Sequence, residues 1–273
     1  MEFQTEAWER YSDSQNRAKR IVRRGADMTL PVLESILDKT KVAGEVDLGV
    51  IEIPVNQIVG IASDCDKEIY TSDFLPLSSI KSEYAESWTW LYMEHMSDAG
   101  LHEAIRCYEY LGKFYVIDGK KRVSILKSNS TAMAKAAVIR ILPVKSEAPD
   151  IQSYYDFLET YEKTGLYQIA LTQPGTANAF LEALGYNPEH VWNEVERCSF
   201  MFYWYPFEHA LKMAFDRNLN ITTADAVSLL LKKHSYAELR KLPSWTLAEM
   251  MQDSWVEMCQ ICNPEFQINA RVA

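Results

Sequence analysis

The stretch from Phe114 to Leu126 constrains the fold more than any other part of the chain. Its sequence is FYVIDGKKRVSIL, in which four apolar residues run directly into Asp118 and Gly119, three consecutive cations follow, and an apolar pattern then resumes. The first four residues predict a buried strand, and the later apolar residues predict the first turns of a helix that packs back on it. A strand, a tight turn and a helix are therefore expected here in direct succession.

The residues of this turn have the chemistry of a phosphate-binding site. A glycine at position 119 lets backbone N–H groups face an anion, and the N-terminus of the following helix adds roughly half a positive charge in the same direction. Lys120, Lys121 and Arg122 add side-chain charge, and the guanidinium also offers a bidentate fork. Short basic motifs are common, so a surface turn with solvated cations is the alternative interpretation.

The segments on either side predict a small sheet with a helix beside it. A turn at residues 110–113 joins two apolar segments into a hairpin, and the first expected strand ends in a short helical turn. A helix over residues 78–99 carries aromatic side chains at helical spacing, which is typical of a core face. The segments expected to contain strands are residues 50–60, 105–108, 114–117 and 136–142.

The order of these segments resembles the ParB/sulfiredoxin superfamily over about residues 46–143. That pattern is a strand ending in I-P-V-x-x-I, a helix ending in a glycine box, a hairpin, and a G-x-x-R loop that opens a helix. The loop here, D-G-K-K-R, is closest to the D-G-x-x-R form of ParB-like free-serine kinases. The resemblance implies an α+β fold, a small mixed sheet with flanking helices. It also implies that nucleotide phosphates are held by Gly119, Lys120, Lys121 and Arg122, with Gly100 and His102 from the glycine box.

Three departures from the superfamily pattern narrow the implied chemistry. Sulfiredoxins carry a cysteine directly after the glycine, where this chain has Lys120, so their reductase chemistry is not expected. Partition-type ParB proteins carry Gly-Glu-Arg-Arg and a further downstream arginine; the differences here disfavour a CTP-driven DNA clamp but leave triphosphate binding expected. The serine-kinase-like members have two histidines where this chain has Lys120 and Lys121. This exchange keeps positive charge but removes groups that titrate near neutrality.

Phosphoryl transfer would require a carboxylate as well as cations. Such reactions generally use a nucleoside triphosphate with Mg²⁺, and an acidic side chain orients or deprotonates the acceptor hydroxyl. In the resembling kinases the catalytic acidic residue follows the first strand–turn unit, which here is rich in carboxylates. Exposure of these residues on a solvated loop is the alternative interpretation. The candidate catalytic residues are Asp118, Asp64, Asp66 and Glu68.

Charge bears directly on whether nucleic acid is a partner. The chain has 28 lysines and arginines against 38 acidic residues, a net charge of −10. DNA-binding domains usually show a basic face and a high pI, so the overall charge disfavours DNA. The local exception is an expected N-terminal helix on which Arg17, Arg20 and Arg24 share a face. This face is the candidate nucleic-acid contact, and solvated charge or internal ion pairing is the alternative.

The positions of glycine and proline residues divide the chain into three expected parts. Residues 1–44 are expected to form helices, one over 5–25 and a second with Pro31 at its first position. Residues 45–145 are expected, from the resemblance, to form the ParB/sulfiredoxin-like domain. Residues 150–273 are expected to be a helical domain without strands.

Cysteine usage and hydropathy indicate the compartment. No apolar stretch approaches the roughly 18 residues of a membrane helix, and the acidic N-terminus lacks the layout of a signal peptide. The five cysteines, an odd number without regular spacing, suit reduced thiols in the cytoplasm. The pair Cys259 and Cys262 has C-x-x-C spacing but no second pair, so no complete metal site from protein ligands is expected.

A dense aromatic run in the helical part is too apolar to lie in water. Burial at the seam between domains is the favoured interpretation, and a partner surface is the alternative. The run comprises Trp192, Phe200, Phe202, Tyr203, Trp204, Tyr205 and Phe207.

Three functions are consistent with these features. The first is a nucleotide-binding protein, either an ATP-dependent phosphotransferase that acts on a small-molecule acceptor or a nucleotide-controlled switch. In this case the sequence leaves open whether the chain turns over as a kinase or a nucleotide hydrolase. The second is a ParB-like DNA-binding partition or transcription regulator, for which no convincing helix-turn-helix is found. The third is an interaction protein whose pocket is idle. The sequence does not fix the oligomeric state.

Overall fold

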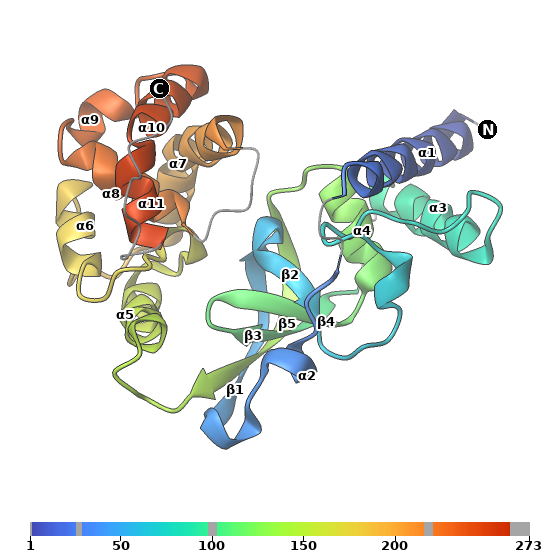
Figure 1. Cartoon of the computed structure of the whole chain (residues 1–273), viewed down its shortest axis with the longest axis horizontal. Helices are drawn as coiled ribbons and strands as arrows, with labels where there is room; N and C mark the ends of the chain where they lie inside the picture. The colour runs from blue at the N-terminus through green and yellow to red at the C-terminus, as the bar shows by residue number, and fades with distance from the viewer. Residues whose placement is uncertain (1, 26–28, 98–102, 216–220, 263–273) are drawn as a thin grey trace. The chain divides into compact units, whose positions relative to one another are not determined.

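The computed structural model describes residues 2–25, 29–97, 103–215 and 221–262 and divides the chain into two compact units (Figure 1). The first unit comprises residues 1–144 and the second residues 145–273. Residues 1–44, expected as a separate helical segment, lie within the first unit. None of the helices in the described ranges has both the length and the apolar character needed to cross a membrane.

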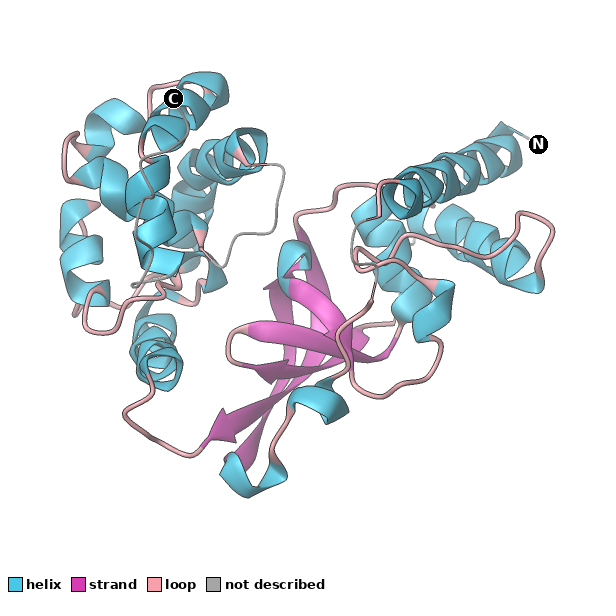
Figure 2. Cartoon of the chain, in the orientation of Figure 1, coloured by secondary structure: helices cyan, strands magenta, loops and turns pink. Residues whose placement is uncertain are grey.

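A five-stranded mixed sheet forms the centre of the first unit, in the order β1-β5-β3-β4-β2 (Figure 2). β3 and β4 form the expected antiparallel hairpin, β1 runs antiparallel to β5, and the pairs β3–β5 and β2–β4 are parallel. This sheet with its flanking helices confirms the α+β class. The strands are β1 (Val42–Pro54), β2 (Ile58–Ile61), β3 (Ile105–Tyr110), β4 (Lys113–Asp118) and β5 (Met133–Pro143).

The hairpin turn explains why β3 and β4 are in register. Leu111 and Gly112 have φ angles of 51° and 72°, the left-handed conformation at both central positions of a two-residue turn. Such turns have a twist that matches the twist of the paired strands. The Gly112 N–H also donates to Glu109 Oε1 at 2.8 Å, which ties the turn to a buried carboxylate.

Helices α1 (Glu2–Arg23), α3 (Glu83–Met96) and α4 (Lys120–Ser128) pack around a shared aromatic cluster. Trp88 lies at its centre, fully buried, and its Nε1–H donates to Ser124 Oγ at 3.0 Å. α3 begins at residue 83 rather than at the expected 78, because the side chain of Ser82 caps the helix by accepting from the Ala85 N–H.

The second N-terminal helix is shorter than expected. α2 (Leu33–Ile36) is a single turn, and Pro31 lies before it rather than at its first position. The reason is that Val32 is extended and forms a β-bridge with Ile61 of β2, so the chain is held to the sheet until α2 begins.

The described part of the second unit, residues 145–215 and 221–262, is helical and contains no strand, as expected. In α8 the Thr222 side chain accepts from the Asp225 N–H and the Asp225 carboxylate accepts from the Thr222 N–H, a reciprocal cap. The helices are α5 (Pro149–Thr164), α6 (Ala177–Ala183), α7 (Glu194–Ala214), α8 (Thr223–Leu231), α9 (Tyr236–Leu239), α10 (Ser244–Asp253) and α11 (Trp255–Cys262).

The aromatic run divides between core and surface. Trp192, Phe200, Trp204 and Phe207 are buried in the core of the second unit itself. In contrast, Phe202, Tyr203 and Tyr205 are exposed, with Phe202 at 76%. The expectation of a seam between domains does not hold for the buried members, which lie in the core of one unit. On α7 the helical period places Phe202 and Tyr205 on the face opposite Phe200, Trp204 and Phe207.

Candidate phosphate-binding turn

Gly119 adopts the backbone conformation that only glycine takes up readily. It is the N-cap of α4, with φ 99° and ψ 22°. A Cβ atom at this position would lie 3.0 Å from Arg122 Nε and 3.2 Å from its Cζ. Because glycine has no side chain, the N-cap residue makes no capping hydrogen bond to the amides of the first turn of α4. The strand–turn–helix expected from the sequence is confirmed, with the three cations in the first turn of α4.

Lys120 reaches the loop after β2. Its Nζ donates to the Cys65 carbonyl oxygen at 2.8 Å and lies 3.1 Å from Asp66 Oδ2. The Lys120 side chain is only 16% exposed, whereas the Asp66 side chain is 58% exposed. The ammonium is therefore placed at the turn by one carboxylate and one carbonyl, both from the carboxylate-rich segment.

Lys121 points toward α3. Its Nζ donates to Ser87 Oγ at 2.6 Å and lies 5.2 Å from the centre of the Tyr84 ring. Both partners are on the first half of α3, so Lys121 joins the N-terminal ends of α3 and α4. A hydroxyl and an aromatic face hold an ammonium without neutralising its charge.

Arg122 is buried, at 8% exposure, and it holds the chain that leads into β3. Its Nη1 donates to the carbonyl oxygens of Glu103 and Ala104 at 2.7 and 3.0 Å, and its Nη2 donates to Asp118 Oδ2 at 2.9 Å. The Glu103 carboxylate is 3.6 Å from Nη1. The guanidinium therefore fixes the turn to two neighbouring segments and has few donors left for a ligand.

The candidate carboxylates separate into two groups. Asp118, the last residue of β4, pairs with Arg122, and Asp66 pairs with Lys120, so both lie at the turn. Asp64 pairs with Lys67 at 2.7 Å, and Glu68 is exposed in the adjoining 3-10 turn. No interaction with the turn is made by these two residues within the described part of the chain.

Some candidate residues lie outside the site or outside the described chain. Gly100 and His102 lie outside the described residues. Within the described part of the chain, no cluster of three or more histidine, cysteine, aspartate or glutamate side chains has the arrangement of a metal site. The partners that the sequence did not indicate are Ser87, Tyr84 and three backbone carbonyls. Among these contacts, only the pairing of Asp118 with Arg122 could have been predicted from the sequence, because the two residues have i,i+4 spacing.

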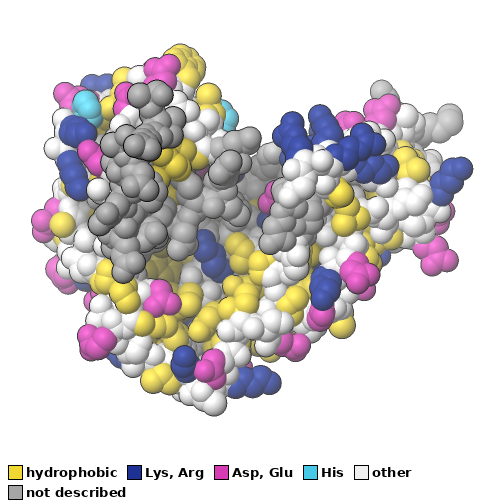
Figure 3. Space-filling view, in the orientation of Figure 1, with side chains coloured by type: hydrophobic (Ala, Val, Ile, Leu, Met, Phe, Trp, Pro, Cys, Tyr) yellow, Lys and Arg dark blue, Asp and Glu magenta, His cyan; other side chains and the backbone are white. Residues whose placement is uncertain are grey.

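The arginine face of α1 is separate from the turn. Arg17 and Arg20 on α1 and Arg24 just after it are exposed, and Figure 3 shows the dark-blue side chains gathered over this helix. α1 reaches α4 at the far end, where Ser14 Oγ donates to Ser128 Oγ at 2.9 Å. Nine residues of helix, about 13 Å at 1.5 Å per residue, separate that contact from the turn.

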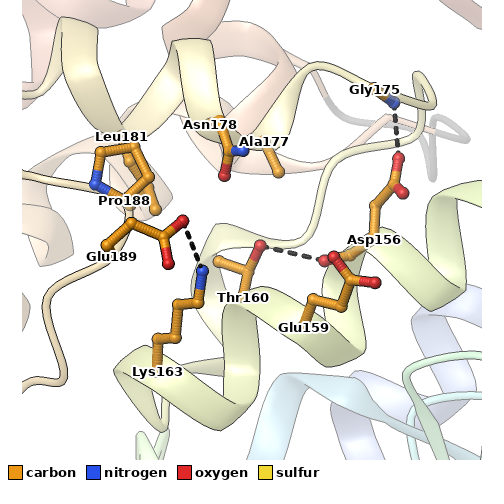
Figure 4. Close-up of a pocket in the computed structure, with 10 residues that line it drawn as sticks. All are labelled: Asp156, Glu159, Thr160, Lys163, Gly175, Ala177, Asn178, Leu181, Pro188 and Glu189. Atoms are coloured by element: carbon orange, nitrogen blue, oxygen red, sulfur yellow. Dashed lines mark hydrogen bonds and ion pairs between the residues drawn. The ribbon is translucent and has the colours of Figure 1, made fainter.

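Two cavities were not expected from the sequence. One, of about 380 Å³, is lined by Arg10 of α1, His95 of α3 and Asn129 after α4, and burial lowers the pKa of His95 below its ordinary value. The other, of about 160 Å³, lies in the second unit (Figure 4). There Asp156 accepts from the Gly175 N–H and Lys163 lies 3.0 Å from Glu189, so these polar groups are already paired. Neither cavity includes a residue of the turn.

No model of a known protein family matches the chain, and no curated protein matches its sequence significantly.

Proposed function

We propose that this chain binds the phosphate groups of a nucleoside triphosphate, together with Mg²⁺, at the N-terminus of α4. The observation that supports this most directly is the conformation of Gly119, which is left-handed, cannot take a Cβ without displacing Arg122, and is followed by three cations. A helix N-terminus with uncapped amides and adjacent ammonium groups is a favourable environment for a polyanion. The proposed activity is that of an ATP-dependent small-molecule phosphotransferase or a nucleotide-controlled switch of the ParB/sulfiredoxin type.

The contacts assign different tasks to the three cations. Lys120 and Lys121 are proposed to contact phosphate, because each is held by groups that a phosphate oxygen can replace as an acceptor. Arg122 is proposed to position the turn, because its guanidinium is occupied by two carbonyls and Asp118. Asp66 is proposed as the carboxylate that orients an acceptor hydroxyl or a water molecule, since it adjoins Lys120 and is solvent-accessible.

A thermal-shift series with ATP, ADP, CTP and GTP, with and without magnesium, tests this function. At a nucleotide concentration of about 100 times the Kd, binding is expected to stabilise the fold by roughly 2.7 kcal/mol. The double variant Lys120→Ala/Lys121→Ala is expected to lose most of this nucleotide-dependent stabilisation. The matched control, Lys81→Ala/Lys135→Ala, removes the same charge from exposed positions of the first unit and is expected to retain it. The proposal fails if no nucleotide shifts the wild-type transition.

DNA binding through the arginine face is a second candidate function. The supporting observation is that Arg17, Arg20 and Arg24 are exposed and that no carboxylate pairs with them in the described part of the chain. If three phosphates are neutralised, affinity for duplex DNA is expected to fall about 40-fold between about 50 and about 200 mM salt. Fluorescence anisotropy measures this, and the triple alanine variant is expected to lose the salt dependence. Flat anisotropy of the wild type at low salt would exclude this function.

A further inference from the structure

The exposed face of α7 carries an apolar row with the spacing of a helix–helix seam. Along this face Val195, Cys198, Phe202, Tyr205 and His209 are separated by alternating steps of three and four residues, the pattern of a helix–helix seam, with His209 as its one polar member. Val195 is 77% exposed, Phe202 76% and Tyr205 54%, and Met213 continues the row at 49%. Large apolar side chains in such a continuous row usually mark a contact surface.

This row is not part of the core of the second unit. The opposite face of α7 supplies the core through Phe200, Trp204, Phe207 and Ala210, which are completely buried. A helix that is apolar on two opposite faces is normally covered on both. The second face of α7 therefore requires a partner that the core of its own unit does not provide.

We infer that the partner is a second copy of this chain, which packs its own α7 antiparallel against the first. In this arrangement a two-fold axis passes close to Phe202 and Tyr205, so that Phe202 of each copy faces Tyr205 of the other. Pro206 lies beside them on α7, and its ring adds apolar surface at the crossing point.

The charges at the two ends of the row favour the antiparallel direction. Glu194 and Lys212 are 18 residues apart, five full helical turns, so they lie on the same flank of α7. Antiparallel packing brings Glu194 of one copy toward Lys212 of the other. Parallel packing would not bring Glu194 and Lys212 together, and it would align the helix dipoles unfavourably.

Within the described residues of the first unit, no helix offers a matching row. The exposed side of α1 carries arginines and a lysine, and the exposed aromatic residue of α3, Trp90, has Glu86 and Glu94 one turn away on either side. A second α7 offers the same apolar row and, when antiparallel, complementary charges at its two ends. An aromatic side chain buries about 150–250 Å². The row therefore offers on the order of 600 Å² per copy, or about 1,200 Å² for a pair, the lower limit of specific interfaces.

Light scattering of the full chain after size exclusion tests this inference. The wild type is expected to be a dimer at micromolar concentration, and Phe202→Glu is expected to weaken dimerisation by about 30-fold or more, the effect of removing a central interface residue. Trp90→Glu is the matched control, because Trp90 is 69% exposed on a different helix, and it is expected to leave the dimer intact. Circular dichroism confirms that both variants are folded.

Cysteine cross-linking tests the direction of packing independently. The proposed axis places exposed Cys198 of one copy opposite position 209 of the other, so His209→Cys is expected to form a cross-linked dimer on mild oxidation. Cys65 and Cys262 are replaced by serine in this experiment. A monomeric wild type, equal weakening by Trp90→Glu, or a Cys198–Cys198 disulfide without His209→Cys would each overturn the inference. Nucleotide binding does not enter any of these measurements.

Discussion

Replacing Arg140 with methionine is expected to lower the free energy of unfolding by about 3–5 kcal/mol, the cost of removing the ion-pair partner of a buried charge. Arg140 on β5 and Glu109 on β3 are register neighbours in the parallel part of the sheet, and Arg140 Nε donates to Glu109 Oε2. The Glu109 side chain has no exposed surface and that of Arg140 is 9% exposed. Denaturant unfolding followed by circular dichroism measures the loss.

Two comparisons separate the effect of burial from the effect of charge. The double variant Glu109→Leu/Arg140→Met is expected to recover most of the loss, because a buried ion pair replaced by apolar groups is often close to neutral. Lys67→Met breaks an exposed pair, in which Lys67 Nζ is 2.7 Å from Asp64, and is expected to cost under about 1 kcal/mol. If Arg140→Met costs no more than Lys67→Met, the interpretation of Arg140 as the ion-pair partner that stabilises a buried carboxylate is wrong.

The parts of the fold that depend on local sequence could be predicted. The apolar run before Gly119 and the pattern after it gave the strand, the turn and the helix, and the hairpin of β3 and β4 followed from two short apolar segments. The start of β1 could not be found in this way. Within the described residues β1 pairs only with β5, and all residues from Val42 to Ile51 are exposed or half-buried, so the segment lacks the apolar alternation that marks a strand.

The contacts of the candidate site depend on tertiary structure, which the sequence does not encode locally. The carbonyl that Lys120 binds is 55 residues away at Cys65, and the hydroxyl that Lys121 binds is 34 residues away at Ser87. A carbonyl acceptor has no signature in the sequence, because every residue has one. The pair of Glu109 and Arg140 was also invisible, since isolated charged residues in a strand normally face solvent.

The aromatic run illustrates a different limit. Its density indicated burial correctly for Trp192, Phe200, Trp204 and Phe207. Composition alone gave no reason to separate these residues from Phe202 and Tyr205, because the exposed row on α7 and the core are both apolar. Only the helical period, applied once α7 is known to be continuous from 194 to 214, places Phe202 and Tyr205 on the face opposite Phe200, Trp204 and Phe207.

Replacing Trp88 with alanine is expected to lower the free energy of unfolding by about 3–5 kcal/mol, the usual cost of removing a fully buried aromatic side chain. Trp88 on α3 stacks on Tyr92, with ring centres 5.6 Å apart, and meets the edge of Tyr11 from α1 at 5.3 Å. Its indole N–H also reaches Ser124 on α4. The substitution therefore removes contacts among three helices at once, and denaturant unfolding measures the loss.

Trp88→Phe and Trp90→Ala are the controls for this prediction. Trp88→Phe keeps most of the ring packing but removes the donor to Ser124 Oγ, which is buried, so a smaller loss of about 1–3 kcal/mol is expected. Trp90 is two residues along the same helix and 69% exposed, so Trp90→Ala is expected to change the unfolding free energy by no more than about 0.5 kcal/mol. Equal losses for Trp88→Ala and Trp90→Ala would contradict the role of Trp88 as the centre of this cluster, because only Trp88 contacts α1 and α4 through its ring.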